Sequence, residues 1–447
     1  MSDLLELAER VLGWSRESEG AEVYVSRGTD TQVQVYQAEV ESLSSATSEG
    51  VGIRVVVEGR QGFAFVGSLE EAAIGEAFQE ARDNAAFATP EEWVGLPAPD
   101  GASPTLHDLW RDELGAYSVQ LKVAQALDLE RHALASGPRI TSVESARWAD
   151  VASEMALAST LGVRATDRST ACYISVSAVA ADGAGSKRGY GYSIGRGPSE
   201  LDPEKACNDA VTRAVRLLGA KQPPSAHLPV VFEPRVAAHL LGLLSSLLSG
   251  ERVLKGTSLF ADRLGEAVAA PGVTLVDDPT NEAAWGASSF DDEGLACRPN
   301  TMIDNGALSC FLYDSTSARR AGTSSTASAV RAGFKSAPGV GARAVYLKPG
   351  ELAPEEVLSH LGHGLLVQSA SGFHSGVNPI SGDFSVGVEG LLFDGGALAA
   401  PVREVTIASS IQRMLLGVAA IGADLQWLPS AAAGMTLAIS EMSMSGA

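Results

Sequence analysis

The spacing of apolar residues predicts both helices and strands at the start of the chain. Leu4, Ala8, Val11 and Leu12 recur at helical spacing within residues 3–17, which is typical of an amphipathic helix. Apolar and polar residues then alternate, as they do in strands with one buried face. The alternating segments, which we expect to form an antiparallel sheet, are residues 22–25, 32–36, 51–57 and 62–66.

Further helices and strands are predicted up to about residue 220. The helices begin at Ser68, span residues 111–136 and run from Asp202 to Gly219. Ser68 and Glu71 have the spacing of a capping box, which would start the first of these helices. Residues 140–194 are rich in Val, Ala, Ser and Thr and are again strand-like. Residues 86–105 and 221–225 contain several prolines and have no period, so we predict connections there.

The second half is predicted to be mostly β. A strand over residues 228–232 and a helix over residues 234–248 precede many short strands separated by glycine turns. We therefore predict an α+β fold, with an N-terminal antiparallel sheet and its helices and a C-terminal, mostly β domain with a few helices. A chain of 447 residues is too long for one ordinary core. The predicted regions are 1–104 and 105–222, as two parts of an N-terminal domain, and 223–447 as the C-terminal domain.

The composition of the chain limits which kinds of molecule it can bind and where in the cell it can work. With 54 acidic and 33 basic residues, the chain has a net charge of −21. This charge argues against binding to nucleic acid or to an anionic membrane, since both attract clustered Lys and Arg. Met1 to Glu6 lack the basic region of a secretory signal, and no apolar run approaches the roughly 20 residues of a membrane span. Four widely spaced cysteines indicate reduced thiols, so we expect a cytoplasmic protein.

Common catalytic and metal motifs are missing from the sequence. None of the seven histidines is followed by glutamate, so a helical H-E-x-x-H zinc site cannot form. The G-x-S-x-G match at Gly191–Gly195 is followed by Arg196, Gly197 and Pro198 rather than by a helix. We therefore reject it as a nucleophile elbow, which requires a strand, a turn and a helix.

A cluster of acids is the first candidate site. Asp291, Asp292 and Glu293 directly precede Gly294. They could act as general acids and bases or bind a hard cation. We favour a turn instead, in which the aspartates accept hydrogen bonds from local backbone amides.

The glycine-rich stretch Ser371–Gly390 is the second candidate site. We expect it to be one long irregular loop, and such loops are more often functional than connective. Its candidate residues are Gly372, His374, Asn378 and Asp383. Asparagine and aspartate could equally satisfy the amides of an ordered turn.

Six short stretches, in this order and spacing, carry a resemblance to a known family. They are Gly50–Val55, Gly59–Ala64, Lys255–Phe260, Phe290–Gly294, Leu312–Asp314 and Gly372–Pro379. On these stretches the chain resembles the TldD/PmbA family over nearly its full length, and more specifically the PmbA (TldE) branch.

The resemblance implies a subunit of a cytoplasmic, heterodimeric zinc metallopeptidase that acts on unstructured or modified peptides. In that family a TldD-like partner carries H-E-x-x-x-H on a helix and supplies the zinc. Counting back without gaps from Gly256, those positions fall on residues 241–246, which read Leu-Gly-Leu-Leu-Ser-Ser. The resemblance therefore implies no cofactor in this chain, zinc in the partner, and no activity of the chain alone.

Three hypotheses follow. In the first, the chain is a non-catalytic subunit whose candidate residues at 291–293, 372, 374, 378 and 383 line a substrate channel or contact the TldD-like partner. In the second, it is a self-sufficient hydrolase that uses Asp291, Asp292 and Glu293 with His374. In the third, it is a homodimeric peptide-binding scaffold that pairs through the apolar Leu240–Leu248 helix face.

Overall fold

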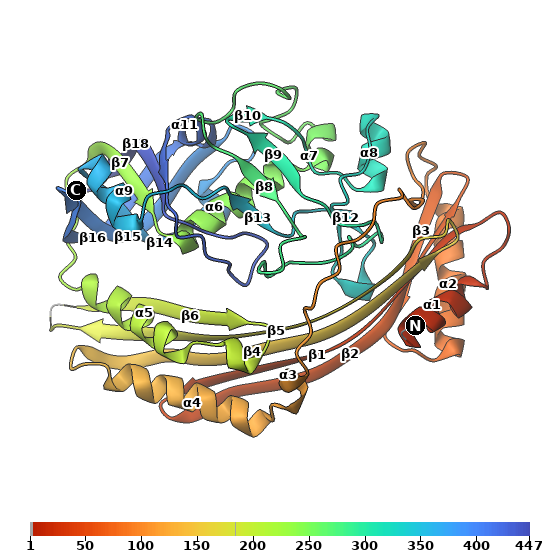
Figure 1. The fold of residues 1–447 in the computed structure, drawn as a ribbon, viewed down its shortest axis with the longest axis horizontal. Coiled ribbons are helices and arrows are strands. Elements are labelled where there is room, and N and C mark those ends of the chain that lie inside the picture. Colours follow the sequence, from red (N-terminus) through yellow and green to blue (C-terminus); the bar gives the residue numbers. More distant parts are fainter. Residues whose placement is uncertain (1–2, 184) are drawn as a thin grey trace.

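The first half of the chain forms one long antiparallel sheet. The computed structural model describes residues 3–183 and 185–447, and Figure 1 shows the sheet as a curved layer below the second half. Its strand order is β3-β2-β1-β4-β5-β6. The strands are β1 (Gly20–Tyr36), β2 (Glu39–Val57), β3 (Arg60–Val66), β4 (Ile140–Ser159), β5 (Arg164–Ala181) and β6 (Ser186–Gly195). Four of them have 17 to 20 residues, and strands of this length accumulate the twist that curves the layer.

The helices of the first half pack on one face of this sheet. The helices are α1 (Asp3–Leu12) and α2 (Glu71–Phe87) at one end, and α3 (Asp112–Ala116), α4 (Val119–Ala135) and α5 (Pro203–Arg216) at the other. Helix α5 lies very close to β6, since a Cβ on Gly189 or Gly191 would lie about 2 Å from a carbonyl oxygen of α5. On β6 the tyrosines Tyr190 and Tyr192 alternate with these glycines. They therefore point to the opposite face, which the helices leave open.

The second half is built around a closed five-stranded barrel. Its order is β16-β15-β14-β7-β18, and a further pairing between β16 and β18 closes the ring. The strands are β7 (Ala226–Phe232), β14 (His363–Ser371), β15 (Asp383–Asp394), β16 (Ala397–Ser410) and β18 (Leu437–Ser445). Val230 and Phe232 join the interior cluster with α6 (Pro234–Leu247), whereas Val231 packs outward against α9 (Pro354–Leu361). The alternation along each strand thus separates the barrel interior from its outer layer.

Short elements connect the barrel strands to one another and to the first sheet. They are α7 (Gly250–Leu254), β8 (Leu275–Asp277), β9 (Asn300–Asp304), β10 (Ala307–Leu308), α8 (Ser315–Ala321), β11 (Ala329–Val330), β12 (Gly339–Val340), β13 (Val345–Leu347), α10 (Phe373–Gly376), α11 (Ile411–Leu416) and β17 (Val418–Ile421). Every helix of the described chain falls short of the length and apolar content that a membrane-spanning helix requires.

The structure confirms the predicted α+β class, with helices on an N-terminal antiparallel sheet and a β-rich second half. Three local predictions were wrong. Glu70 rather than Ser68 is the N-cap of α2, and its side chain makes no capping bond. The helix predicted over residues 111–136 is interrupted, because Ser118 caps the start of α4. The stretch Ser371–Gly390 is not one loop, because β15 begins at Asp383. The division near residues 104 and 222 stays a prediction.

Candidate functional site

The acidic cluster lies in a buried junction between the two halves of the chain. Asp291 and Glu293 are 0% exposed. Oδ1 of Asp291 accepts hydrogen bonds from the backbone N–H groups of Glu293 and Leu295, and Oδ2 accepts one from Ala329. Burial, together with the charge of Glu293, raises the pKa of Asp291 to about 7. These backbone partners are the ones that an aspartate in a structural turn would have.

Glu293 connects this turn to the first sheet through buried ion pairs. Arg54 on β2 donates to Oε1 of Glu293 at 3.2 Å and to Glu22 on β1 at 2.6 Å. Arg331 pairs with the same Glu22 at 2.8 Å. These four side chains, which we call the junction network, are at most 3% exposed. The network therefore joins β1 and β2 to the acidic cluster, through Glu293, and to Arg331 further along the second half.

Opposite charges stabilise the ionised forms of Glu22 and Arg54 in the junction network. Burial by itself raises the pKa of Glu22, but the charges of Arg54 and Arg331 outweigh this effect and lower it. Burial likewise disfavours charged Arg54, yet the charges of Glu22 and Glu293 raise its pKa. Removing any one of these residues would leave an uncompensated charge out of reach of water.

Asp292 is bound in the same region. Its Oδ2 pairs with Arg343 at 2.6 Å and accepts a hydrogen bond from the backbone N–H of Arg331 at 2.7 Å. All three acids thus have partners inside the protein. This arrangement favours a structural role for Asp291, Asp292 and Glu293 over the predicted contact with a substrate or partner chain.

The second candidate cluster is ordered by its own turns. Gly372 precedes α10 with a φ of +85°, a conformation that favours glycine. Oδ1 of Asn378 accepts hydrogen bonds from the backbone N–H groups two and three residues further on. Asp383 accepts one from the hydroxyl of Ser381 at 2.6 Å. Asn378 and Asp383 therefore shape the turn that leads into β15.

His374 lies apart from the acidic cluster. It is exposed on α10, which follows barrel strand β14 and packs against β15, whereas the acids bind groups of β2, β11 and α8. Within residues 3–183 and 185–447, no hydrogen bond or ion pair links His374 to Asp291, Asp292 or Glu293. An acid and a base that act together must reach the same reacting group. The structure therefore does not assemble the site of the hydrolase hypothesis.

The loop before β15 contacts helix α6 instead. The ring of Phe373 stacks on that of His239, with centroids 5.7 Å apart and planes 14° apart. Phe373 also meets Phe384 of β15 edge-on at 6.1 Å. Nδ1 of His239 lies 2.9 Å from the carbonyl oxygen of Arg235, one turn earlier on α6. These contacts hold the loop beside the helix on which the resemblance places H-E-x-x-x-H.

Helix α6 has no residues suited to zinc at those positions. Leu241 is buried in the barrel core, and Ser246 is only partly exposed. Gly242 lines a pocket of about 440 Å³ together with Tyr190, Tyr192, Arg235 and His239. Across the described chain, no three His, Cys, Asp or Glu side chains gather as a metal site would require. A zinc ion does not fit this helix.

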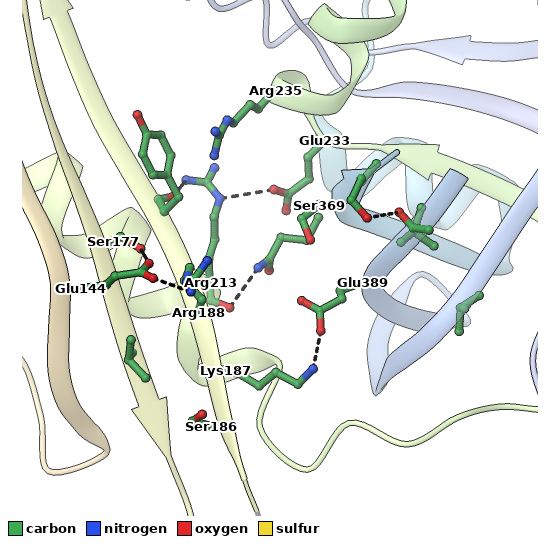
Figure 2. Close-up of a pocket in the computed structure, with 18 of the residues that line it drawn as sticks. Glu144, Ser177, Ser186, Lys187, Arg188, Arg213, Glu233, Arg235, Ser369 and Glu389 are labelled. Carbon is green, nitrogen blue, oxygen red and sulfur yellow. Dashed lines mark hydrogen bonds and ion pairs between the residues drawn. The ribbon is translucent and has the colours of Figure 1, made fainter. Parts of the chain in front are cut away.

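The pocket beside α6 adjoins a larger cleft between the sheet and the barrel. The cleft has a volume of about 1100 Å³ and shares Tyr190 and Arg235 with the smaller pocket. Figure 2 shows Lys187 and Arg188 reaching into it from the sheet, and Glu233, Arg235 and Glu389 from the barrel side. Residues of β4, β5 and β6 form one wall, and residues of β14, β15 and β16 form the other. We take the cleft and the pocket together as the candidate functional site.

Most residues of this cleft could not be predicted from the sequence. Arg147, Tyr190 and Arg235 belong to no known motif, and Tyr192 lies in the G-x-S-x-G match that we rejected as a nucleophile elbow. One signal was present in β6, where two glycines alternate with the two tyrosines. That alternation indicates a strand with a helix packed closely on one face and aromatic rings on the other.

Three family models match consecutive parts of the chain. They are described as PmbA/TldA metallopeptidase domain 1 (residues 21–85), central domain (residues 112–218) and C-terminal domain (residues 225–446). Among curated proteins, the chain is 28% identical over 447 residues to "Metalloprotease PmbA" of Escherichia coli O157:H7, covering 100% of this chain and 95% of that protein. It is 25% identical over 452 residues to "Metalloprotease TldD homolog" of Haemophilus influenzae, covering 95% and 92%.

A solved structure shares the fold. TldE from Thermococcus kodakarensis superimposes with a TM-score of 0.87 at 23% identity, over 99% of both chains. The likeness thus includes the sheet, the barrel and their connection.

Removing one carboxylate of the junction network tests its role in stability. We expect Glu22→Gln to lower the free energy of unfolding by about 3–5 kcal/mol, because it leaves Arg54 and Arg331 buried with too little negative charge. The matched control is Glu154→Gln, which removes a partly exposed ion pair with Arg27 and should cost at most about 1 kcal/mol. Urea unfolding measures the free energy of unfolding of both variants and of the parent. Equal losses in the two variants would show that the network is dispensable.

The raised pKa of Asp291 predicts a pH dependence of stability. Below pH 7 folded Asp291 holds a proton, whereas the unfolded chain releases it above about pH 4. The folded state therefore binds more protons in this window, and this group's contribution to stability falls as the pH rises. From pH 5.5 to 8, we expect the parent to lose about 2 kcal/mol relative to Asp291→Asn in urea unfolding. Parallel curves for the two proteins would refute this assignment.

Proposed function

Because this chain belongs to the PmbA/TldD metallopeptidase family, we propose that it is the non-catalytic, TldE-like subunit of a two-chain zinc metallopeptidase. One observation carries the proposal. Where the resemblance places H-E-x-x-x-H, helix α6 has Leu241, Gly242 and Ser246. Leucine and glycine offer no side-chain ligand, and nothing at these positions can act as the base that activates water.

The catalytic groups would come from a TldD-like partner with an intact H-E-x-x-x-H helix. The pair would work in the cytoplasm on unstructured or modified peptides. In this assembly the chain itself binds no zinc, and its part is to bind and orient the peptide. The fold of α6 is kept, since Val236, Leu244 and Leu247 still anchor it in the barrel core.

The cleft suits an extended peptide. Both of its walls come from β-strands, and its volume of about 1100 Å³ exceeds that of most small-molecule sites. Ser145, Ser186 and Ser369 line it, and such hydroxyl groups can bond a peptide backbone in many registers. A wall of this kind would favour flexible substrates over folded ones.

An apolar surface next to α6 is the part that we propose meets the partner. Leu240 and Leu243 of α6 are only partly buried and line an apolar hollow together with α11. Leu416 of α11 is 55% exposed and Ile380 of the adjoining loop is 64% exposed. The backbone bond from Ile411 to Gly382 connects that loop to α11. Without the TldD-like chain, the same surface could pair two copies of this chain.

Zinc content and peptidase activity test whether the partner, and not this chain, supplies the metal and the catalytic groups. The chain purified alone should contain no stoichiometric zinc and should not cleave a flexible peptide. Together with a TldD-like chain, one zinc per pair and peptide cleavage are expected. Metal analysis and mass spectrometry of the peptide products give both readouts. Stoichiometric zinc and full activity in the lone chain would overturn the proposal.

The partner surface can be tested by charge insertion. Ile380→Asp combined with Leu416→Asp should weaken association with the TldD-like chain by at least about tenfold, because two charges would be buried without partners. Leu106→Asp is the control, since Leu106 is 81% exposed and directly follows the proline-rich connection at residues 86–105. Analytical ultracentrifugation measures association, and urea unfolding checks that both variants stay folded. Unchanged association of the double variant would place the interface elsewhere.

A further inference from the structure

We propose that the cleft recognises a carboxylate group of its peptide, and that Arg235 and Arg147 bind it. The inference rests on the proposed function in that it takes the ligand to be a peptide. It adds the chemical group that the site selects.

The ion pairs of the cleft leave two cations unused. Among the acids that line it, Glu144 pairs with Arg188, Glu233 with Arg213 and Arg216, Glu389 with Lys187, and Glu404 with Arg403. Arg147 and Arg235 also line the cleft. Neither guanidinium makes a hydrogen bond or an ion pair with any residue in the described ranges 3–183 and 185–447, although the chain as a whole carries a net charge of −21. Local positive charge on a strongly acidic protein points to an anionic ligand.

Arg235 is held in place although it has no ionic partner. It lies on the first turn of α6, and its guanidinium sits 3.9 Å from the centroid of the Tyr190 ring. Stacking of this kind leaves the N–H groups at the edge of the guanidinium free to bond a carboxylate in a fork. Because the side chain is already oriented, less conformational entropy is lost on binding. Figure 2 shows Arg235 extending from the helix into the cleft.

Arg147 faces the same space from the sheet. It lies opposite Ser175 on β5, which in turn lies opposite Tyr192 on β6. These three residues therefore form one row across the open face of the sheet. Arg147 is exposed, so its charge is available to a ligand in the cleft.

The phenol of Tyr192, in the adjoining pocket, adds a neutral hydrogen-bond donor to the site. Tyr192 lines this pocket with Arg235 and His239. Burial raises the pKa of Tyr192 to about 12, so its hydroxyl keeps its proton at neutral pH. It can therefore donate to an anion but does not repel one. The pocket thus contains a cation and a neutral hydrogen-bond donor. It lies beside α6, the helix on which the resemblance places H-E-x-x-x-H in TldD-like chains.

Two parts of a peptide could supply the carboxylate: its C-terminus, or an Asp or Glu side chain. Three flexible Gly/Ser peptides with a neutral dye at the N-terminus separate them. One has a free C-terminus, one is amidated, and one is amidated with a central Glu. Fluorescence anisotropy gives the Kd of each for the isolated chain and for the complex with the TldD-like partner. At least one carboxylate-containing peptide should bind about tenfold more tightly than the neutral one, and the difference should shrink with salt.

Charge-removing variants tie this preference to the two arginines. Arg235→Gln and Arg147→Gln should each weaken binding of the preferred peptide severalfold and together bring it to the level of the neutral peptide. Arg131→Gln is the control, because Arg131 is an exposed arginine on α4, on the opposite face of the sheet. Urea unfolding checks that all variants are folded.

Three results would overturn the inference. They are equal binding of all three peptides, no binding of any, and a preference that survives the double substitution. None of them bears on whether the chain forms a zinc-containing complex with its partner. A lone chain with its own zinc would instead overturn the proposed function, so the two failures can be told apart.

Discussion

The two halves of this chain are held together by charges that water cannot reach. Glu22 and Arg54 belong to the first sheet, and Glu293 and Arg331 come from the second half. Taking such groups out of water costs several kcal/mol each, and only close partners offset that cost. The network is therefore satisfied in one relative placement of the halves. Because β1 pairs with β4, which carries the cleft residue Arg147, this placement also fixes the width of the cleft.

The barrel and the sheet have complementary parts in the site. The barrel buries one side of α6 and presents the other, with Arg235, His239 and Gly242, to the sheet. The sheet supplies Tyr190 and Tyr192 on the face that its helices leave open. A pocket of this shape beside a helix whose residues offer no zinc ligands supports the proposal that this chain holds substrate for chemistry on another chain.

Local patterns in the sequence were enough to predict the α+β class and helix α6. They could not predict the pairing of Arg54 with Glu293, which lie 239 positions apart. An acid in a turn and an acid in a catalytic cluster look alike in sequence, and only the backbone partners of Asp291 in the structure distinguished the two. The contact between Arg235 and Tyr190 could not be predicted for a related reason. The two residues come from different halves of the chain, and they meet only because the junction network sets the halves side by side.

Native mass spectrometry of the tagged chain, purified from the cells that produce it, tests the central claim most directly. We predict a one-to-one complex with a chain that contains H-E-x-x-x-H, and one zinc ion that stays with that partner when the complex is dissociated. A homodimer of this chain that retains its own zinc would contradict the account.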